Sequence, residues 1–266
     1  MMPNDLNLDF VLIPAGEFKI GSDPAADRDA QIDEMPQHYL NITDFYMMRQ
    51  PVTNAQYALF VAATGHRPPL FWENGQFAAG KDQHPVVGVS YADAIAFCRW
   101  AGQVLGKPVR LPTEAEWEKA ARGSDGRIYP WGNRWEAGRC NNAEAKLGGP
   151  STVGQFSPQG DSPYGVADVA GNVQEWCSSL FNQYPYDPTD GREAIVYELN
   201  ADHLLPRQRD MGGTSNPQAD EASWGKSCIR GGSWRESKLQ SRCAYRSWAA
   251  PMHRSDDTGF RCCYEP

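Results

Sequence analysis

Helix-start signals are confined to the first half of this 266-residue chain. Thr53 with Gln56, and Thr113 with Glu116, form capping-box patterns, in which two side chains satisfy N–H groups that a helix start leaves free. Ser90 is a third N-cap, ahead of apolar residues at i, i+3, i+4 and i+7 spacing. A glycine closes each segment. The sequence therefore predicts helices over 53–65 and 90–106 and a shorter one over 113–123.

The rest of the sequence favours short strands and long loops. Residues 10–21 predict two short strands around a Pro-Ala-Gly turn, and residues 39–48 are strand-like. The acidic segment 23–34 lacks the spacing and glycine of an EF-hand, which indicates a solvated loop. Asp125-Gly126 is a hairpin signal, and glycine, proline and asparagine dominate beyond it. We therefore expect an α+β fold with small antiparallel sheets, two or three helices and little regular secondary structure.

The chain shows no internal repeat and no linker composition, so we predict one domain over residues 1–266. Residues 178–226 are rich in Pro, Asp and Gly and are predicted to be an insertion loop. Residues 229–261 carry glycine pairs, aromatics and arginines at both ends of a polar run. We predict that this C-terminal segment displays the binding or active site.

Composition disfavours several classes of partner. The net charge of −8 disfavours nucleic acid, because phosphate binding needs a basic face. The chain has no apolar run of about 18 residues, so we predict no membrane span. The first residues lack a basic region followed by an apolar run, so we expect no signal peptide and a cytoplasmic protein. The seven cysteines include no C-x-x-C pair and the five histidines show no ligand spacing, which disfavours structural zinc and favours reduced thiols.

Eight motifs together resemble one family, the sulfatase-modifying-factor family, whose founding member is the formylglycine-generating enzyme. In chain order they are Val11–Phe18, Pro51–Tyr57, Pro85–Ser90, Arg110–Glu118, Tyr129–Asn133, Gly171–Trp176, Arg230–Trp234 and Gly259–Arg261. The match runs from about Phe10 to the C-terminus. It implies a formylglycine-generating-enzyme-like variant of the C-type lectin fold.

The resemblance implies a structural calcium site. The family's ligands correspond to the side chains of Asp168 and Glu175 and to the carbonyls of Gly171 and Val173. The chemistry is suitable, since two carboxylates flank a glycine turn and calcium takes six to eight oxygens. We expect calcium here to hold loops that have little backbone pairing of their own.

A second family calcium site begins at the position of Asn141 and uses the carbonyl of Asn142. Its remaining ligands would fall around residues 145–147, where this chain has no carboxylate at the matching place.

The same resemblance disfavours copper. The oxidase members hold copper(I) with two cysteines, because soft thiolates suit that ion. The first of these cysteine positions is Glu236 here, and the second is at about Ser241. Cys243 instead matches a family disulfide cysteine whose partner position is Ala121, and Gln174 stands where the family has an aromatic residue. We therefore expect no copper-dependent formylglycine formation.

Two other cysteines, Cys98 and Cys262, match a family pair that forms a disulfide. We expect them to be close in space and reduced in a cytosol.

Two function classes follow. The first is a ligand- or protein-binding module whose surface is segment 235–257, with a protein or peptide as partner, since Tyr, Trp and Arg anchor interfaces. Its candidate residues are Arg235, Glu236, Lys238, Gln240, Tyr245, Ser247, Trp248, Met252, His253 and Ser255. The alternative is a metal-dependent oxidase or oxygenase that uses Glu236, Ser233 and a cysteine. A scaffold role in a larger assembly is a third possibility.

Some proteins with this fold are diversified in this segment by retroelements. The layout fits, with Gly-Gly-Ser-Trp, a mixed run, and Gly-Phe-Arg near the C-terminus. One observation opposes diversification. Such mutagenesis acts mainly on adenines in asparagine codons, and five residues of this segment have codons that end in a purine, which asparagine codons could not yield. These are Glu236, Lys238, Gln240, Trp248 and Met252. Diversification stays an option that neighbouring template and reverse-transcriptase genes would support.

Overall fold

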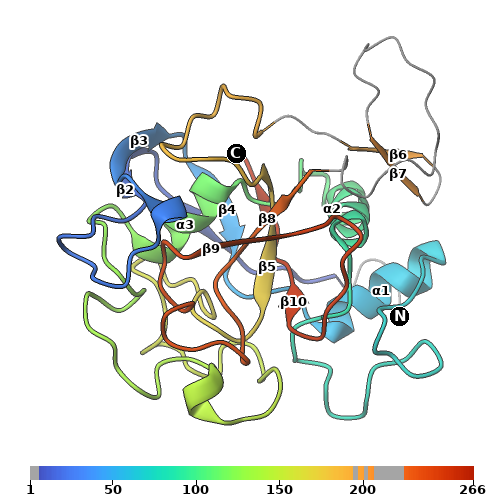
Figure 1. Ribbon diagram of the computed structural model, residues 1–266. Helices are drawn as coiled ribbons and strands as arrows, with labels where there is room; N and C mark the ends of the chain where they lie inside the picture. The colour runs from blue at the N-terminus through green and yellow to red at the C-terminus, as the bar shows by residue number, and fades with distance from the viewer. Residues whose placement is uncertain (1–5, 194–196, 201–202, 207–224) are drawn as a thin grey trace.

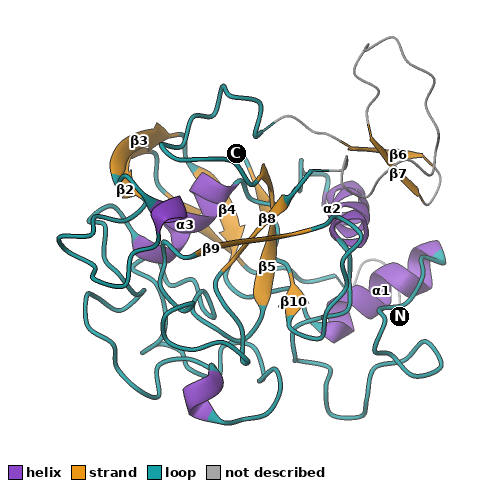
Figure 2. Cartoon of the chain, in the orientation of Figure 1, coloured by secondary structure: helices purple, strands orange, loops and turns teal. Residues whose placement is uncertain are grey.

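The computed structural model describes residues 6–193, 197–200, 203–206 and 225–266. The three predicted helices are confirmed as α1 (Asn54–Thr64), α2 (Tyr91–Leu105) and α3 (Glu114–Arg122). Each begins with a complete capping box and is followed by a glycine with positive φ. Loops make up most of the drawn chain (Figure 2).

Aromatic side chains join α1 to α2. The rings of Tyr57 and Phe97 stack with centroids 5.6 Å apart, and Phe60 meets Phe97 edge-on at 5.7 Å. Phe260, from the end of the chain, packs on both Tyr57 and Phe97. The C-terminal segment is thus part of the main core, because such contacts bury large apolar surfaces.

Two small sheets organise the N-terminal part. β1 (Phe10–Ile13), β4 (Phe45–Met48) and β11 (Cys263–Tyr264) form one, and β2 (Gly16–Ile20) pairs with β3 (His38–Ile42) in the other. The strand-like stretch 39–48 contains two strands, β3 and β4, which lie in different sheets. Leu40 and Phe45 pack in separate apolar clusters, and the polar residues between β3 and β4 allow the change of sheet.

A four-stranded sheet carries the C-terminal segment. Its order is β10 (Thr258–Gly259), β5 (Gln174–Leu180), β8 (Ser227–Arg230) and β9 (Arg246–Ala249). The β10–β5 pair is parallel and the other two pairs are antiparallel. The segment, orange to red in Figure 1, leaves β8, returns as β9 and passes to β10. Both of its ends therefore lie beside the 171–176 motif.

The insertion predicted over 178–226 begins too early, because residues 178–180 belong to β5. Tyr186 is buried against β2 and its N–H donates to His38 Nε2, so the stretch around this residue packs on the domain. β6 (Tyr197–Asn200) pairs with β7 (His203–Pro206). The remainder of the predicted insertion lies outside the described residues, apart from 225 and 226.

Two other local predictions were wrong. Asp125-Gly126 forms a turn without strand pairing, followed by an isolated bridge between Tyr129 and Gly132. The acidic segment 23–34 is not simply solvated, because Asp27 and Glu34 are buried. Both accept hydrogen bonds from the Arg242 guanidinium, which reaches them from the C-terminal segment. A buried partner cation makes this burial possible.

Two short 3-10 helices, Ile32–Glu34 and Ala143–Ala145, complete the secondary structure of the described residues. None of the helices in this part of the chain is long and apolar enough to cross a membrane.

Candidate functional site

Glycines shape the start of the C-terminal segment. Gly231 and Gly232 follow β8 with φ of +97° and +67°, values that L side chains rarely adopt. A Cβ on Gly232 would lie 2.7 Å from the carbonyl oxygen of Gln240. At the other end, a Cβ on Gly259 would lie 2.5 Å from the carbonyl oxygen of Val86. The two ends of the segment therefore require glycine for close backbone packing.

Buried ion pairs hold the segment from below. Arg261 donates to both carboxylate oxygens of Glu175 at 2.6 Å each. Arg246 donates in the same bidentate way to Glu114 on α3, at 2.6 and 2.9 Å. All four side chains have no exposed surface. Removing one partner of such a pair leaves an uncompensated buried charge and costs about 3–5 kcal/mol.

The two positions where the family oxidases carry copper-binding cysteines form a polar site here. Glu236 accepts a hydrogen bond of 2.8 Å from the side-chain amide of Gln174. Gln174 itself stands where the family has an aromatic residue, so two departures from the family pattern bond to each other. Ser241 donates to the carbonyl of Ser237. Hydroxyl and carboxylate oxygens do not suit copper(I).

A second carboxylate lies close to Glu236. Burial raises the pKa of Glu236 above its ordinary value; the Gln174 hydrogen bond opposes this and the charge of Asp257 adds to it. Asp257 accepts hydrogen bonds from the hydroxyls of Ser233 and Ser255. The retained Ser233 is therefore a partner of a carboxylate.

The predicted contact residues differ in exposure. Five are exposed, namely Arg235, Lys238, Trp248, Met252 and His253. Five are half-buried, namely Glu236, Gln240, Tyr245, Ser247 and Ser255. The Arg235 side chain is 49% exposed, and Trp248 is 45% exposed. The exposed residues supply the outer surface of the segment, and the half-buried residues are partly covered by their neighbours.

The exposed anchors are held in place by neighbours. Arg235 stacks on the Trp234 ring, 4.5 Å from its centroid, and pairs with Asp256. Trp248, on β9, has the Lys226 ammonium 4.0 Å from its ring centroid. These contacts reduce the freedom of long side chains before any partner binds, which lowers the entropy cost of recognition.

The predicted first calcium site fits the ion only in part. Both oxygens of Glu175 accept from Arg261, and one also accepts from Trp117 Nε1. Of about four lone-pair positions on a carboxylate, these donors take three. Burial raises the pKa of Asp168 to about 6, although a hydrogen bond from the Gly154 N–H acts to lower this pKa. Among the described residues, no group of three or more His, Cys, Asp or Glu is placed to hold a metal.

Gly171 and Val173, whose carbonyls complete that predicted set, are buried in the same loop. The Gly171 N–H donates to the Gly231 carbonyl, so this loop is tied to the turn after β8.

Free oxygens lie at Asn141 of the second predicted site and at Ser151, which was not part of that prediction. Asn141 Oδ1 and Ser151 Oγ are buried and have no hydrogen-bond partner in the described structure. Both residues contact Asn172, whose side-chain oxygen accepts from Ser151 N–H and Asn141 Nδ2. The Asn142 side-chain oxygen caps the 3-10 helix by accepting from Ala145 N–H. Unpaired buried oxygens are what a hard cation or an ordered water would satisfy.

None of the seven cysteines, all of which the structure describes, is exposed. Cys98 Sγ and Cys262 Sγ lie 3.5 Å apart, so these two are close as expected. Cys243 packs in the same apolar cluster as Ala121, the position of its missing family partner. Burial raises the pKa of Cys140 to about 12, although Ser241 bonds to it. A buried thiol with a raised pKa is a poor nucleophile and a poor metal ligand.

Comparison with known proteins identifies the family of this chain. A family profile described as sulfatase-modifying factor enzyme 1-like domain matches residues 2–266. The chain belongs to this family.

Three curated proteins are similar to this chain. The formylglycine-generating enzyme of Thermomonospora curvata is 30% identical and covers 99% of this chain and 96% of its own length. The serine/threonine-protein kinase pkn1 of Chlamydia pneumoniae is 32% identical over 98% of this chain, which spans only 38% of that relative. The inactive C-alpha-formylglycine-generating enzyme 2 of Bos taurus is 30% identical, with 82% and 87% covered.

Solved structures confirm the fold. PvdO from Pseudomonas aeruginosa superposes with a TM-score of 0.75 at 25% identity and covers 100% of this chain and 97% of its own. Treponema denticola variable protein 1 gives a TM-score of 0.69 at 22% identity, with 97% and 95% covered. The fold is therefore the formylglycine-generating-enzyme-like variant of the C-type lectin fold.

Sequence reasoning missed the bond between Gln174 and Glu236, although both had been identified as departures from the family pattern. It also missed the cluster of His66 and Arg67 around Asp93. The one available signal was Asp93 itself, three residues after the N-cap Ser90, where it completes a capping box.

Proposed function

We propose that this chain is a module that binds a protein or peptide through segment 235–257. The observation that carries the proposal is the bond between Glu236 and Gln174 at the place where the oxidase members hold copper. In place of a thiol, the site has a carboxylate, Glu236, that is hydrogen-bonded to the Gln174 amide. No cysteine is exposed to replace it.

The outer surface of the segment supports recognition. It presents an arginine, a tryptophan and a methionine, residue types that fill pockets in partner proteins. Buried pairs such as Arg246 with Glu114 hold the base of this surface. A pre-organised loop loses less entropy on binding than a free loop.

The test is selection of peptide ligands against the whole protein, followed by titration calorimetry. We expect Arg235→Ala and Trp248→Ala each to weaken binding at least tenfold, the effect of losing about 1.4 kcal/mol. Tyr39→Ala is the matched control, because Tyr39 is an aromatic residue 61% exposed on β3. Equal binding by all three variants would refute the proposed surface.

A second candidate is a metal-dependent oxidase or oxygenase, which the relative named formylglycine-generating enzyme favours. It would need Glu236, Ser233 and a cysteine to share a metal. Ser233 donates to Asp257, and the thiols are buried. Copper and iron titrations with oxygen uptake on thiol peptides test it. Turnover above the metal-only rate would reverse the ranking.

We also propose that calcium stabilises the loops at Asp168 and at Asn141, as a structural ion without a catalytic role. Asp168 and the unpaired oxygens of Asn141 and Ser151 are the donors that would hold it. A chelator should lower the melting temperature and added calcium should restore it, since a ligand that binds only the folded state stabilises it. No shift, with no metal by elemental analysis, would remove the idea.

The cytoplasmic location and retroelement diversification stay predictions from the sequence. Template and reverse-transcriptase genes beside this one would support diversification, and their absence would end it. A fractionation of cells that express the tagged protein tests the location.

A further inference from the structure

A groove of about 570 Å³ lies between two segments that are far apart in the sequence. Ile32, Asp33 and Met35 form one wall, and the stretch 181–184 together with Lys226 forms the other. The Phe181 N–H donates to the Lys226 carbonyl at 2.7 Å, so the backbone joins the two parts of the second wall. We call this space the Phe181 groove.

Arg246 fixes the two walls relative to each other. Its Nη1 donates to the Asp33 carbonyl at 2.7 Å, and its Nη2 donates to the Asn182 carbonyl at 2.9 Å. Its guanidinium also lies 4.4 Å from the centroid of the Phe181 ring. Because Arg246 is itself buried and paired with Glu114, the groove is formed before any partner binds, which lowers the entropy cost of binding.

The groove adjoins Trp248 of the proposed recognition surface. Trp248 follows Arg246 by two positions on β9, so both side chains leave the strand on the same face. The Lys226 ammonium lies 4.0 Å from the Trp248 ring centroid. A partner that covers Trp248 is therefore within reach of the groove.

Apolar side chains lie on both walls. Ile32 is 86% exposed, the largest value among the big hydrophobic residues that the structure describes. Met35 is on the same wall, and the half-buried rings of Phe181 and Tyr184 are on the other. Covering such surface with a partner removes apolar area from water, which is favourable.

The groove also carries one unpaired charge of each sign. Among the described residues, the Lys226 ammonium has no carboxylate partner and contacts only the Trp248 ring. The Asp33 carboxylate has no donor in this part of the chain, although its backbone carbonyl accepts from Arg246. Since the two charges do not pair with each other, both are available to a partner.

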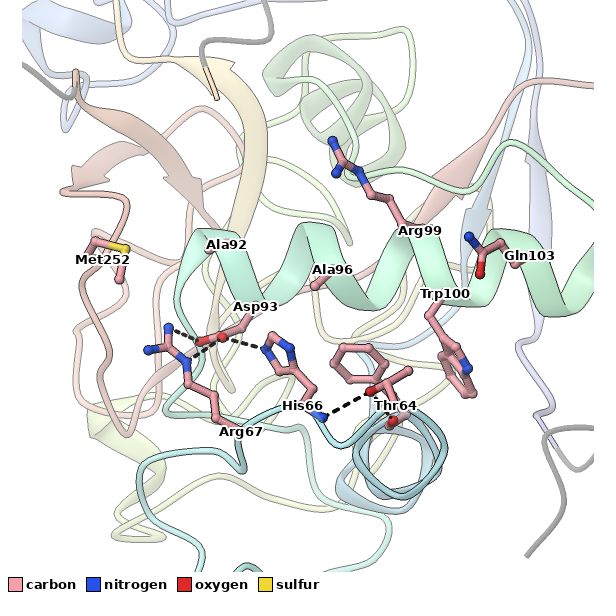
Figure 3. A pocket seen from close by; sticks show the side chains of 11 residues that line it. Thr64, His66, Arg67, Ala92, Asp93, Ala96, Arg99, Trp100, Gln103 and Met252 are labelled. Atoms are coloured by element: carbon pink, nitrogen blue, oxygen red, sulfur yellow. Dashed lines mark hydrogen bonds and ion pairs between the residues drawn. The ribbon is translucent and has the colours of Figure 1, made fainter. Parts of the chain in front are cut away.

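The cavity between α1 and α2 differs in this respect. It has about 260 Å³, and Figure 3 shows its carboxylate, Asp93, bonded to His66 and Arg67. Asp93 also accepts from the N–H and the hydroxyl of Ser90. That charge is therefore used within the chain, whereas the two charges of the Phe181 groove are not.

We propose that the Phe181 groove gives the recognition surface its sequence specificity, an inference that rests on the proposed function. The occupant is a peptide segment with a bulky apolar residue between an acidic and a basic residue. The apolar side chain packs between Ile32 and Phe181, the acidic residue pairs with Lys226, and the basic residue pairs with Asp33. Opposite charges at two fixed positions select both the sequence and the direction of the peptide.

The test is selection from a random octapeptide library against the full chain and against charge-reversed variants. Peptides selected by the wild type should share an apolar residue with an acidic residue on one side and Lys or Arg on the other. Lys226→Glu should replace the acidic preference by a basic one, and Asp33→Lys should replace the basic preference by an acidic one. Identical charge preferences for all three proteins would overturn the proposal.

The affinity of one peptide selected by the wild type locates the site. Ile32→Ser, at a side chain that is almost fully exposed, should weaken binding at least tenfold. Asp33→Lys should do the same and leaves Trp248 untouched, whereas Lys226→Glu also removes a contact to that ring. Lys19→Glu is the matched control and should bind normally, because Lys19 lies over the Tyr39 ring at 5.8 Å and outside the groove lining.

The failure of this inference is distinguishable from that of the proposed function. Peptides whose binding depends on Arg235 and Trp248 but not on Ile32 and Asp33 would overturn the groove and leave the recognition surface standing. A selection that yields no binding peptide would overturn both.

Discussion

Single buried charges carry much of the specificity of this molecule. Arg261 lies two residues beyond Gly259 in the sequence, yet its guanidinium neutralises Glu175 on β5. The pair also reaches the backbone, since Arg261 donates to the carbonyls of Met48, Arg49 and Ala167. One side chain thus joins β4, the loop before β5 and the C-terminal segment.

Arg261→Met is expected to destabilise the fold by about 3–5 kcal/mol, because Glu175 keeps a buried charge without a partner. The measurement is the free energy of unfolding from urea denaturation. Adding Glu175→Gln to this variant should recover part of the loss. Arg235→Met, at an arginine whose ion pair with Asp256 is exposed, is the control and should cost under about 1 kcal/mol.

Asp93 gives the stability a defined pH dependence. Burial raises the pKa of Asp93, but the hydrogen bonds from His66, Arg67 and Ser90 outweigh it, so this pKa lies well below the ordinary carboxyl range. A depressed pKa contributes stability above about pH 4, and that stability is lost as the pH falls below it. Asp93→Asn should therefore cost about 3 kcal/mol at pH 7.

The difference between Asp93→Asn and the wild type should shrink between about pH 4 and pH 2. Urea denaturation at several pH values measures it. A constant difference across this range would contradict the ionic role of Asp93.

At the scale of elements, α3 is the unexpected case. Five of its nine residues are charged, which favours a helix exposed to water. Yet every residue of α3 is buried. Glu114 meets Arg246, and Glu118 meets Arg122 and Arg230 at 2.6 and 2.5 Å. Two of these three arginines come from the C-terminal part of the chain, which covers the helix and neutralises it.

The turn after β8 has a conformational requirement that a matched pair of glycines can test. Gly232→Ala combines a positive φ with a clash against the Gln240 carbonyl and should cost more than about 2 kcal/mol. Gly106, which follows α2 at φ +63°, has no atom within 4 Å of a Cβ. Gly106→Ala should cost about 1 kcal/mol, so similar losses of unfolding free energy for both would refute the packing argument.

Over the whole molecule, the C-terminal segment is both a core element and a surface. β11 lies in the sheet of β1 and β4, β9 and β10 lie in the sheet of β5, and Phe260 packs between the two long helices. Two thiols of this segment's end, Cys262 and Cys263, are completely buried in the core as a result.

Thiol labelling tests that architecture. All seven cysteines should resist a disulfide-exchange reagent in the native state, and all should react in denaturant, because buried thiols with raised pKa are inert. Colorimetric titration counts them. Fast labelling without denaturant would show an exposed thiol, and five reactive groups in denaturant would show that Cys98 and Cys262 are oxidised.

The helices, their boundaries and the fold family were predictable from the sequence, because capping boxes and terminal glycines act within a few residues of the chain. The family motifs and their order could likewise be read directly along the chain. The loss of the copper thiols was visible at Glu236 and Ser241 for the same reason. What the sequence determined by itself is therefore the set of local elements and the chemistry that the site lacks.

Only the tertiary structure decided which charges are buried and which side chains meet. Asp27, Glu34, Glu114 and Glu118 have the local pattern of solvent-exposed residues. They are buried because arginines more than 100 residues away, Arg230, Arg242 and Arg246, bring compensating charge. The Glu236–Gln174 bond and the Phe181 groove arise in the same way, from segments distant in sequence. Pairing energies depend on distance in space, and the order of residues alone does not specify that distance.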